Sequence, residues 1–187
     1  MAILSLSDIK THVGVESTDT SYDAVLTLIG GAVEGFAEKY LDRYLAKTDY
    51  EELHVTSIGS IWLHNTPIAS IASVKTGATA KEDEMETLRN NDYMVNEKTG
   101  HLTIFDYVQG VPSFVLVSYN GGYTTLPNDL KFALLEQIKY WFGLYKSGSE
   151  AVTQVNVLGT SIQIAKPDDW LPFVKSILQK YRRISHG

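Results

Sequence analysis

The side chains best suited to acid–base or metal chemistry are five histidines spread along the chain: His12, His54, His64, His101 and His186. No two have the His-x-x-x-His spacing that places metal ligands on one helix face, and none stands beside a carboxylate at a ligand spacing. His54 and His64 could face each other across neighbouring strands, although histidines on exposed strands are far commoner than paired ligands. The sequence therefore predicts no metal site and no bound cofactor.

Motifs for nucleophilic or phosphate chemistry are missing as well. The chain has no cysteine, which removes thiol nucleophiles, thiolate ligands and disulfides together and fits a reducing cytoplasm. It has no G-x-S-x-G elbow, no P-loop and no G-x-G-x-x-G after a strand. Carboxylates are plentiful, but no spacing selects two of them as an acid–base pair. We therefore predict that the chain is not an enzyme.

Aromatic side chains suggest a second kind of chemistry, the stacking of sugars or bases. Four of them fall on predicted strands: Trp62, Tyr93, Tyr107 and Tyr119. An open aromatic face would bind carbohydrate or peptide, whereas the same residue types are also common packing residues of strands. A monomeric binding module with such a face is therefore one of two candidate functions.

The composition is that of a globular protein of about one domain. The chain has 187 residues, of which 44% are hydrophobic and 20% charged, enough to bury a core. The N-terminus lacks the features of a signal peptide, and no run approaches the ~20 apolar residues of a membrane span. The formal net charge of −6 argues against a protein that grips nucleic-acid phosphates across its surface.

Two helices are predicted near the N-terminus. A capping box at Ser5 begins a short helix that ends at Gly14. A second helix covers about 21–44, and its Gly31 and Gly35 share a face that would let another backbone approach closely. On a helical wheel its apolar side contains Val25, Leu28, Ile29, Val33, Phe36 and Tyr40.

From about residue 51 the hydrophobic period changes from 3.6 to 2, which predicts strands. A turn at 97–100, with Gly100 available for a positive φ, predicts an antiparallel hairpin. Helix returns after Pro127, and a long connection over 147–166 contains two short strand-like pieces around Leu158. Connections of this length are usually functional or disordered.

The helix after Pro127 is apolar over roughly 220° of its circumference, against the ~100° stripe of a helix that covers only its own core. Such a helix is either central in its domain or covered on a second side by another molecule. Self-association is the more economical interpretation, and a central helix wrapped by its own domain is the alternative. The candidate subunit-interface residues are Phe132, Leu135, Tyr140 and Phe142.

The predicted fold class is α+β, a small bundle of about four helices with an inserted antiparallel β block. We treat the chain as a single domain of five segments: N-terminal helices (1–46), β block (51–120), central helix (127–146), long loop (147–166) and C-terminal helix (168–183).

The order of these elements resembles that of a known family. The stretches that carry the resemblance are "SYDAVLTLIGGAVEGFAEKYLDR", "HNTPIASIASVKT", "DYMVNEKTGHLTIF", "VLVSYNGGYTTLPNDLKFALLEQIKYWF" and "PFVKSILQKYRR". The most specific run is V-x-Y-x-x-G-Y-x-x-x-P-x-D-L-K from Val117 to Lys131, and the closing Tyr-Arg-Arg at Tyr181 is the second match. The chain is similar to the head–tail connector (adaptor, or head-completion) proteins of long-tailed bacteriophages and prophages.

This resemblance implies a structural virion protein without catalytic residues or cofactors. It implies a ring of twelve copies that binds the portal protein on one side and a tail-completion or stopper protein on the other. DNA would pass through the ring without sequence-specific binding, which fits a negative net charge. The protein would be made in the bacterial host cytoplasm and end in the virion, at the head–tail interface.

Two regions are the candidate contacts with portal or tail. The basic C-terminal end would reach an acidic partner, and the long loop would become ordered on docking. The residues concerned are Tyr181, Arg182, Arg183, Val155, Val157 and Leu158.

Overall fold

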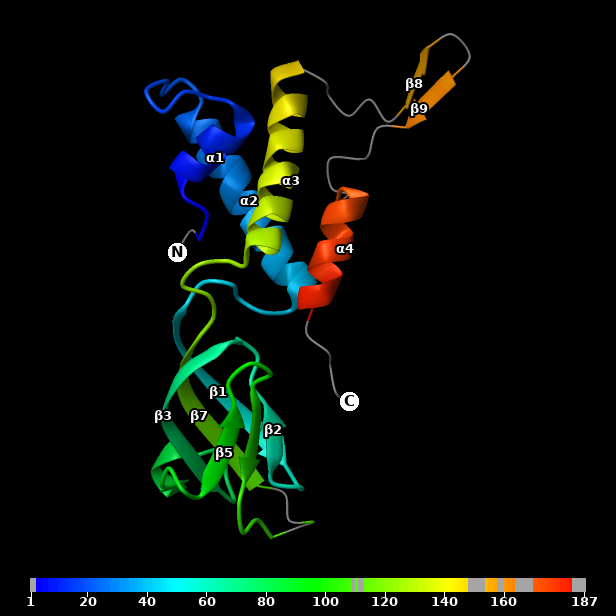
Figure 1. The fold of residues 1–187 in the computed structure, drawn as a ribbon. Coiled ribbons are helices and arrows are strands. Elements are labelled where there is room, and N and C mark those ends of the chain that lie inside the picture. Colours follow the sequence, from blue (N-terminus) through cyan, green and yellow to red (C-terminus); the bar gives the residue numbers. More distant parts are fainter. Residues whose placement is uncertain are drawn as a thin grey trace. The chain divides into compact units, whose positions relative to one another are not determined.

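The structure is a computed structural model that describes residues 3–108, 110, 113–147, 154–157, 160–163 and 170–182, with backbone alone for 154–157 and 160–163. These residues form helices and antiparallel sheets, so the predicted α+β class is confirmed (Figure 1). The chain divides into two compact units. The helical unit comprises Met1–Asp42 and Thr125–Gly187, and the β unit comprises Arg43–Thr124. In the sequence the β unit is therefore an insertion between two helices.

The helices are α1 (Leu6–Val13), α2 (Asp23–Leu41), α3 (Asn128–Ser147) and α4 (Pro172–Tyr181), and a 3-10 turn, η1, covers Glu82–Glu84. The strands of the β unit are β1 (Thr48–Thr56), β2 (Ser60–Trp62), β3 (Ile68–Gly77), β4 (Glu86–Thr87), β5 (Tyr93–Asn96), β6 (His101–Ile104) and β7 (Ser113–Gly121). Two further strands, β8 (Gln154–Val157) and β9 (Thr160–Gln163), follow α3. They pair as a hairpin, which confirms the two predicted strand-like pieces around residue 158.

Helix α1 has the predicted caps. The Ser5 hydroxyl accepts a hydrogen bond from the Asp8 backbone N–H at 3.1 Å, which satisfies a donor at the helix start. Gly14 ends the helix with a φ of 75°, and its N–H donates to the Lys10 carbonyl. These short-range signals fix both ends of α1.

The buried face of helix α2 coincides only in part with the apolar side of the wheel. Its buried residues are Leu26, Gly30, Val33, Ala37 and Leu41. Leu28 and Phe36 lie on the apolar side of the wheel, but their side chains are 74% and 51% exposed. Gly30 lies under α1, since a Cβ there would meet Ile9 Cδ1 at 2.8 Å. The core face is therefore set by this close approach of α1 and not by the largest apolar residues.

Helix α3 is the central helix of the helical unit. It buries Leu130, Ala133, Leu134, Leu135, Gln137, Ile138 and Phe142. Gln137 is fully buried, and its Oε1 accepts a hydrogen bond from the Leu171 N–H at 3.0 Å. Because this bond lies just before Pro172, it positions the start of α4. The predicted start of that helix at 168 lies outside the described residues.

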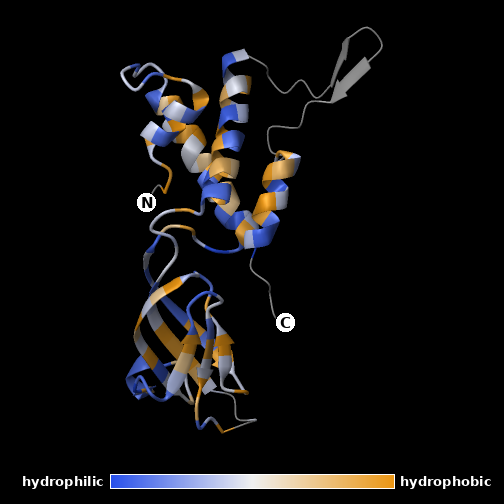
Figure 2. Ribbon diagram, viewed as in Figure 1, coloured by the Kyte–Doolittle hydropathy of each residue, from blue (hydrophilic) through white to orange (hydrophobic). Residues whose placement is uncertain are grey.

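The β unit encloses its own core between two antiparallel sheets. One sheet has the strand order β1-β7-β3-β4 and the other β2-β6-β5. Apolar residues recur along both (Figure 2). The core consists of Ile61, Leu63, Ile68, Val74, Leu102, Ile104, Val115, Val117 and Tyr119. The predicted hairpin between β5 and β6 is confirmed, with Gly100 at a φ of 73°.

The two ends of the β unit are clipped together near its junctions with the helical unit. The Tyr123 N–H donates to the Leu45 carbonyl at 2.8 Å, and the Lys47 N–H donates to the Tyr123 carbonyl at 3.0 Å. Ala46 and Tyr123 form an isolated parallel bridge. The chain therefore enters and leaves the β unit side by side. None of the helices in the described part of the chain has the length and apolarity needed to cross a membrane.

Candidate functional site

A polar cluster in the β unit begins with two residues of β1. The two-residue period of a strand places Glu52 and His54 on one face and Leu53 and Val55 on the other. Leu53 and Val55 are exposed, whereas the Glu52 and His54 side chains are only 12% and 15% exposed. His64 is the second residue after the end of β2, and its side chain reaches the same place.

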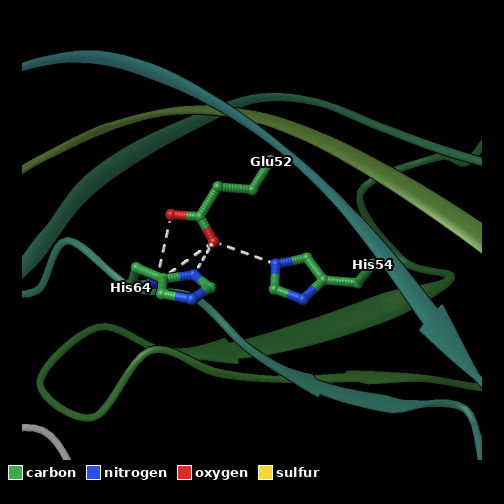
Figure 3. A group of neighbouring side chains, drawn as sticks. All are labelled: Glu52, His54 and His64. Atoms are coloured by element: carbon green, nitrogen blue, oxygen red, sulfur yellow. Dashed lines mark hydrogen bonds and ion pairs between the residues drawn. The ribbon is translucent and has the colours of Figure 1, made fainter. Parts of the chain in front are cut away.

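The three side chains converge on one carboxylate oxygen (Figure 3). Glu52 Oε2 lies 2.9 Å from His54 Nε2 and 2.5 Å from His64 Nδ1. The two imidazole rings stack with centroids 5.6 Å apart and an interplanar angle of 26°. One potential ligand atom from each residue lies within 4.8 Å of the others. This arrangement is a histidine–carboxylate cluster of the kind that binds divalent transition metals.

The other oxygen of Glu52 is held by buried donors. Tyr119 donates its hydroxyl hydrogen to Glu52 Oε1, and Asn65 Nδ2 lies 3.3 Å from the same oxygen. The backbone N–H of His64 donates to both carboxylate oxygens, at 3.1 and 3.2 Å. The Asn65 N–H donates in turn to the Tyr119 hydroxyl at 3.0 Å. The position of the carboxylate is therefore fixed by a second layer of hydrogen bonds.

These hydrogen bonds keep Glu52 ionised. Burial raises the pKa of its carboxyl group, but hydrogen bonds with His54, Tyr119 and His64 have the larger combined effect and lower the pKa to about 2. The pKa of Tyr119 is raised by burial and by its hydrogen bond to the carboxylate. At neutral pH the cluster therefore contains a carboxylate anion and a neutral phenol.

Close backbone packing fixes the segment that carries His64. Gly100 has a positive φ, and a Cβ there would meet the Leu63 carbonyl oxygen at 2.7 Å. A Cβ on Gly121 would collide with the Asn65 carbonyl oxygen. Arg43 Nη1 donates to the Thr66 carbonyl at 3.1 Å and to its hydroxyl at 2.7 Å. Contacts with Gly100, Gly121 and Arg43 therefore hold the segment that carries His64 in place.

The sequence prediction missed part of this cluster. The possible approach of His54 and His64 is observed, but the prediction that no histidine stands beside a carboxylate at a ligand spacing is wrong. Glu52 and His54 are two residues apart, a spacing that brings side chains together on a strand and not on a helix. The pattern Glu-x-His on a predicted strand was the signal available.

The predicted interface residues fall into two groups. Phe132 is 51% exposed and lies in edge contact with His12, with ring centroids 5.7 Å apart, and 6.2 Å from the exposed Phe173 of α4. We call Phe132 and Phe173 the Phe132 patch. Tyr140 is half-buried, whereas Leu135 and Phe142 are buried within the helical unit of a single chain. The protein's own helices therefore cover much of the broad apolar arc of α3.

A second apolar surface lies on α2. Leu28 and Phe36 are exposed, and Phe36 meets Trp141 of α3 edge to face at 5.8 Å. We call these three residues the α2 patch. Gly31 and Gly35 share a helical face with each other, and no atom of the described residues lies within 4 Å of a Cβ built on either glycine. Among the described residues, no contact explains why these two positions lack side chains.

The two patches lie on opposite sides of α3. Trp141 follows Phe132 by nine residues, which at 100° per residue is half a turn around the helix. The Phe132 patch therefore lies on α3 and α4, and the α2 patch lies on α2 and α3.

The predicted portal and tail contacts are described in part. Tyr181 is half-buried and donates a hydrogen bond to Asp129 Oδ1 at 2.6 Å, which joins the end of α4 to the start of α3. Arg182 is exposed, and its guanidinium lies 5.6 Å from the centroid of the Tyr40 ring. Arg183 and Leu158 lie outside the described residues, as do the side chains of Val155 and Val157.

The aromatic residues considered for a stacking face are packing residues. Tyr119 is a core residue of the β unit, and Tyr93 and Tyr107 pack against that core. Trp62 is half-buried and lies 4.4 Å from the His101 ring. These four side chains therefore do not form an open aromatic surface for carbohydrate or peptide.

A small helical unit with exposed apolar patches on two sides is typical of a subunit that assembles with other proteins. The head completion protein family matches residues 2–184 of the 187-residue chain. The chain belongs to the head completion protein family, and its role is that of a structural head–tail connector.

Three solved structures of gene transfer agent (GTA) particles contain chains of similar fold. One is the neck of an empty particle, computed with C6 symmetry (TM-score 0.60, 13% identity, 99% of this chain and 93% of that chain covered). A second is the virion of a native particle (TM-score 0.61, 15% identity, 99% and 93% covered). A third is the neck of a native particle, computed with C12 symmetry (TM-score 0.51, 14% identity, 99% and 92% covered). No match is found among curated proteins.

Proposed function

We propose that the chain is a subunit of a ring that docks beneath the portal, extends the DNA channel and joins the capsid to the tail. The observation that carries this proposal is the presence of two different apolar patches on opposite sides of α3. A closed ring needs such a pair, because each copy contacts the next through unlike surfaces. Twelve copies is the expected number, supported by the C6 and C12 symmetry of the similar neck structures.

The ring contact is expected to bring the Phe132 patch of one copy against the α2 patch of the next. Leu28, Phe36 and Phe132 are all more than half exposed, so burying them would remove a large apolar area from water. The bare face at Gly31 and Gly35 would admit close backbone approach. Tyr140 is retained as an interface candidate, whereas Leu135 and Phe142 are already covered by their own chain.

The end of α4 is the proposed contact with portal or tail. The exposed Arg182 can form a bidentate pair with a carboxylate of the portal, or of a tail-completion or stopper protein. Arg183, Val155, Val157 and Leu158 belong to the same proposal. The net charge of −6 suits a channel that DNA crosses without sequence-specific binding. The protein would be made in the host cytoplasm and act in the virion.

The Phe132→Glu variant tests the ring contact. A buried phenylalanine contributes about 1.5–3 kcal/mol, and a glutamate there would also carry a charge into the contact, so we expect incorporation at least ~10-fold weaker. Wild-type and variant subunits are mixed with the purified portal of the same particle, and the copies bound per portal are measured by mass photometry.

Phe105→Glu is the matched control, because Phe105 has a similar exposure, 46%, but lies in the β unit outside both patches. It should assemble as the wild type does. Full incorporation of Phe132→Glu would remove Phe132 from the contact. Failure of the wild type to bind the portal at all would contradict the connector ring itself.

A further inference from the structure

We propose that Glu52, His54 and His64 form a zinc site that joins β1 to the segment after β2. Glu52 and His54 come from strand β1 and His64 from the segment between β2 and β3, and the three side chains meet at one point (Figure 3). The site is independent of the ring contact, since it uses no residue of either apolar patch.

The donor set selects the class of ion. Two imidazole nitrogens and one carboxylate oxygen form a common three-residue zinc set, with the fourth position open to water. Hard ions such as Mg²⁺ favour oxygen ligands and octahedral geometry, which this set does not supply. The His64 side chain is 40% exposed, so the cluster opens to solvent on that side and a water can complete the coordination.

The observed geometry is close to what a zinc ion requires. Ligands about 2.0–2.1 Å from a tetrahedral ion lie about 3.3 Å from one another. Here the Glu52 Oε2 atom is 2.9 Å from His54 Nε2 and 2.5 Å from His64 Nδ1. All three donor atoms lie within 4.8 Å of one another. Side-chain rotations that move the donor atoms by about one ångström or less would therefore make room for the ion.

The surroundings are arranged as the second layer of a metal site is. Tyr119 and Asn65 hold the carboxylate oxygen that faces away from His54. Gly100, Gly121 and Arg43 fix the segment that carries His64. Such outer partners orient metal ligands, and their loss typically lowers metal affinity about 10–100-fold. Little ordering of the chain would accompany binding, because the ligands already lie together.

Zinc titration of the full-length protein tests this inference. Isothermal calorimetry with ZnCl₂ should show saturable binding of about one ion per chain, and MgCl₂ should not bind at this site. His64→Ala should weaken zinc binding by ~100-fold or more, and Tyr119→Phe should weaken it by ~10–100-fold. Added zinc should raise the Tm of the wild type, and this rise should be lost in His64→Ala.

Cobalt gives a second, spectroscopic measurement. Co²⁺ in a tetrahedral nitrogen–oxygen site has strong visible absorption bands, which should appear with the wild type and disappear with His54→Ala or His64→Ala. His64 is the most exposed of the three residues, so its variant is the one that should keep the fold, as checked by circular dichroism.

His12→Ala is the matched control. His12 also pairs with a glutamate, its Nε2 lying 2.8 Å from Glu136 Oε1, but it belongs to the helical unit and has no second histidine in that contact. This variant should bind zinc as the wild type does. The inference is overturned if the wild type shows no saturable zinc binding, or if zinc binding survives in His64→Ala, or if it is lost in His12→Ala.

Discussion

Tyr119 connects the core of the β unit to its polar cluster. Its ring is 1% exposed, and its hydroxyl both donates to Glu52 and accepts from the Asn65 N–H. The run that carries the family resemblance contains this tyrosine, and Gly122 of the same run packs against Ala46 with a φ of 94°. The signature is therefore structural: Tyr119 bonds the segment at Asn65, and Gly122 packs against Ala46.

Tyr119→Phe should destabilise the β unit. The substitution leaves the buried Asn65 N–H without an acceptor and removes a donor from Glu52, which costs about 1–3 kcal/mol of unfolding free energy. Urea denaturation followed by circular dichroism measures the difference. Tyr93→Phe is the control, since its hydroxyl makes only a 3.4 Å exposed contact with Asn90. Equal stability of the two variants would show that the Tyr119 hydroxyl contributes little.

Single residues could be predicted where the signal is local. Ser5, Gly14 and Gly100 were assigned correctly because a cap or a turn depends on neighbours within about four residues. At the cluster, the Glu-x-His pattern on a strand was available for Glu52 and His54, but the approach of His64 could be raised only as a possibility, because it comes from another part of the chain. Its approach depends on the register of strands and on glycine packing around residues 63–66.

At the scale of elements, α2 has apolar residues on two faces, one buried in the helical unit and one exposed. On α2 a buried face contains Leu26 and Val33, and an exposed face contains Leu28 and Phe36. The wheel detects that both are apolar, but it cannot say which faces the helix's own core. Which face is buried depends on where α1 packs, at Gly30. The sequence of α2 alone does not show where α1 will pack.

Replacing the exposed glycines of α2 separates subunit stability from assembly. Gly31→Ala and Gly35→Ala should each stabilise the free subunit by about 0.5–1 kcal/mol, because alanine is the better helix former and no atom of the described part of the chain lies within 4 Å of the added methyl group. The same variants should bind the portal-templated ring less well if a neighbouring copy packs there. Thermal denaturation measures the first effect and mass photometry the second.

Gly30→Ala is the control, because its methyl group would meet Ile9 Cδ1 at 2.8 Å. It should show no such gain in stability. Unchanged ring formation by both Gly31→Ala and Gly35→Ala would contradict close backbone approach at this face.

At the scale of the whole molecule, the chain consists of one discontinuous unit and one continuous unit. The helical unit is built from both ends of the sequence, whereas residues 43–124 form the β unit without interruption. The order of periodicities along the sequence predicted this insertion and the α+β class. It could not predict that the insertion would begin as early as Arg43, because residues 43–47 have no strand pattern and are held by bonds to Thr66 and Tyr123.

The excised segment 43–124 should fold by itself. Its core residues Val74, Leu102, Val115 and Val117 are fully buried within the unit, so the apolar area that stabilises it does not depend on the helices. Cooperative thermal unfolding and dispersed amide signals in NMR spectra are expected. The same segment with Val74→Asp should be unfolded, since it buries an unpaired charge. A wild-type segment without cooperative unfolding would contradict this independence.

The clip between Leu45 and Tyr123 has a consequence for how such a chain can diversify. These hydrogen bonds keep the first and last residues of the β unit next to each other, whatever lies between them in the sequence. A hairpin of the β unit can therefore become longer or shorter, or be replaced, without changing the distance that the chain must cover between α2 and α3. Selection can therefore reshape the inserted module for a new host particle while the framework that supports it keeps its dimensions.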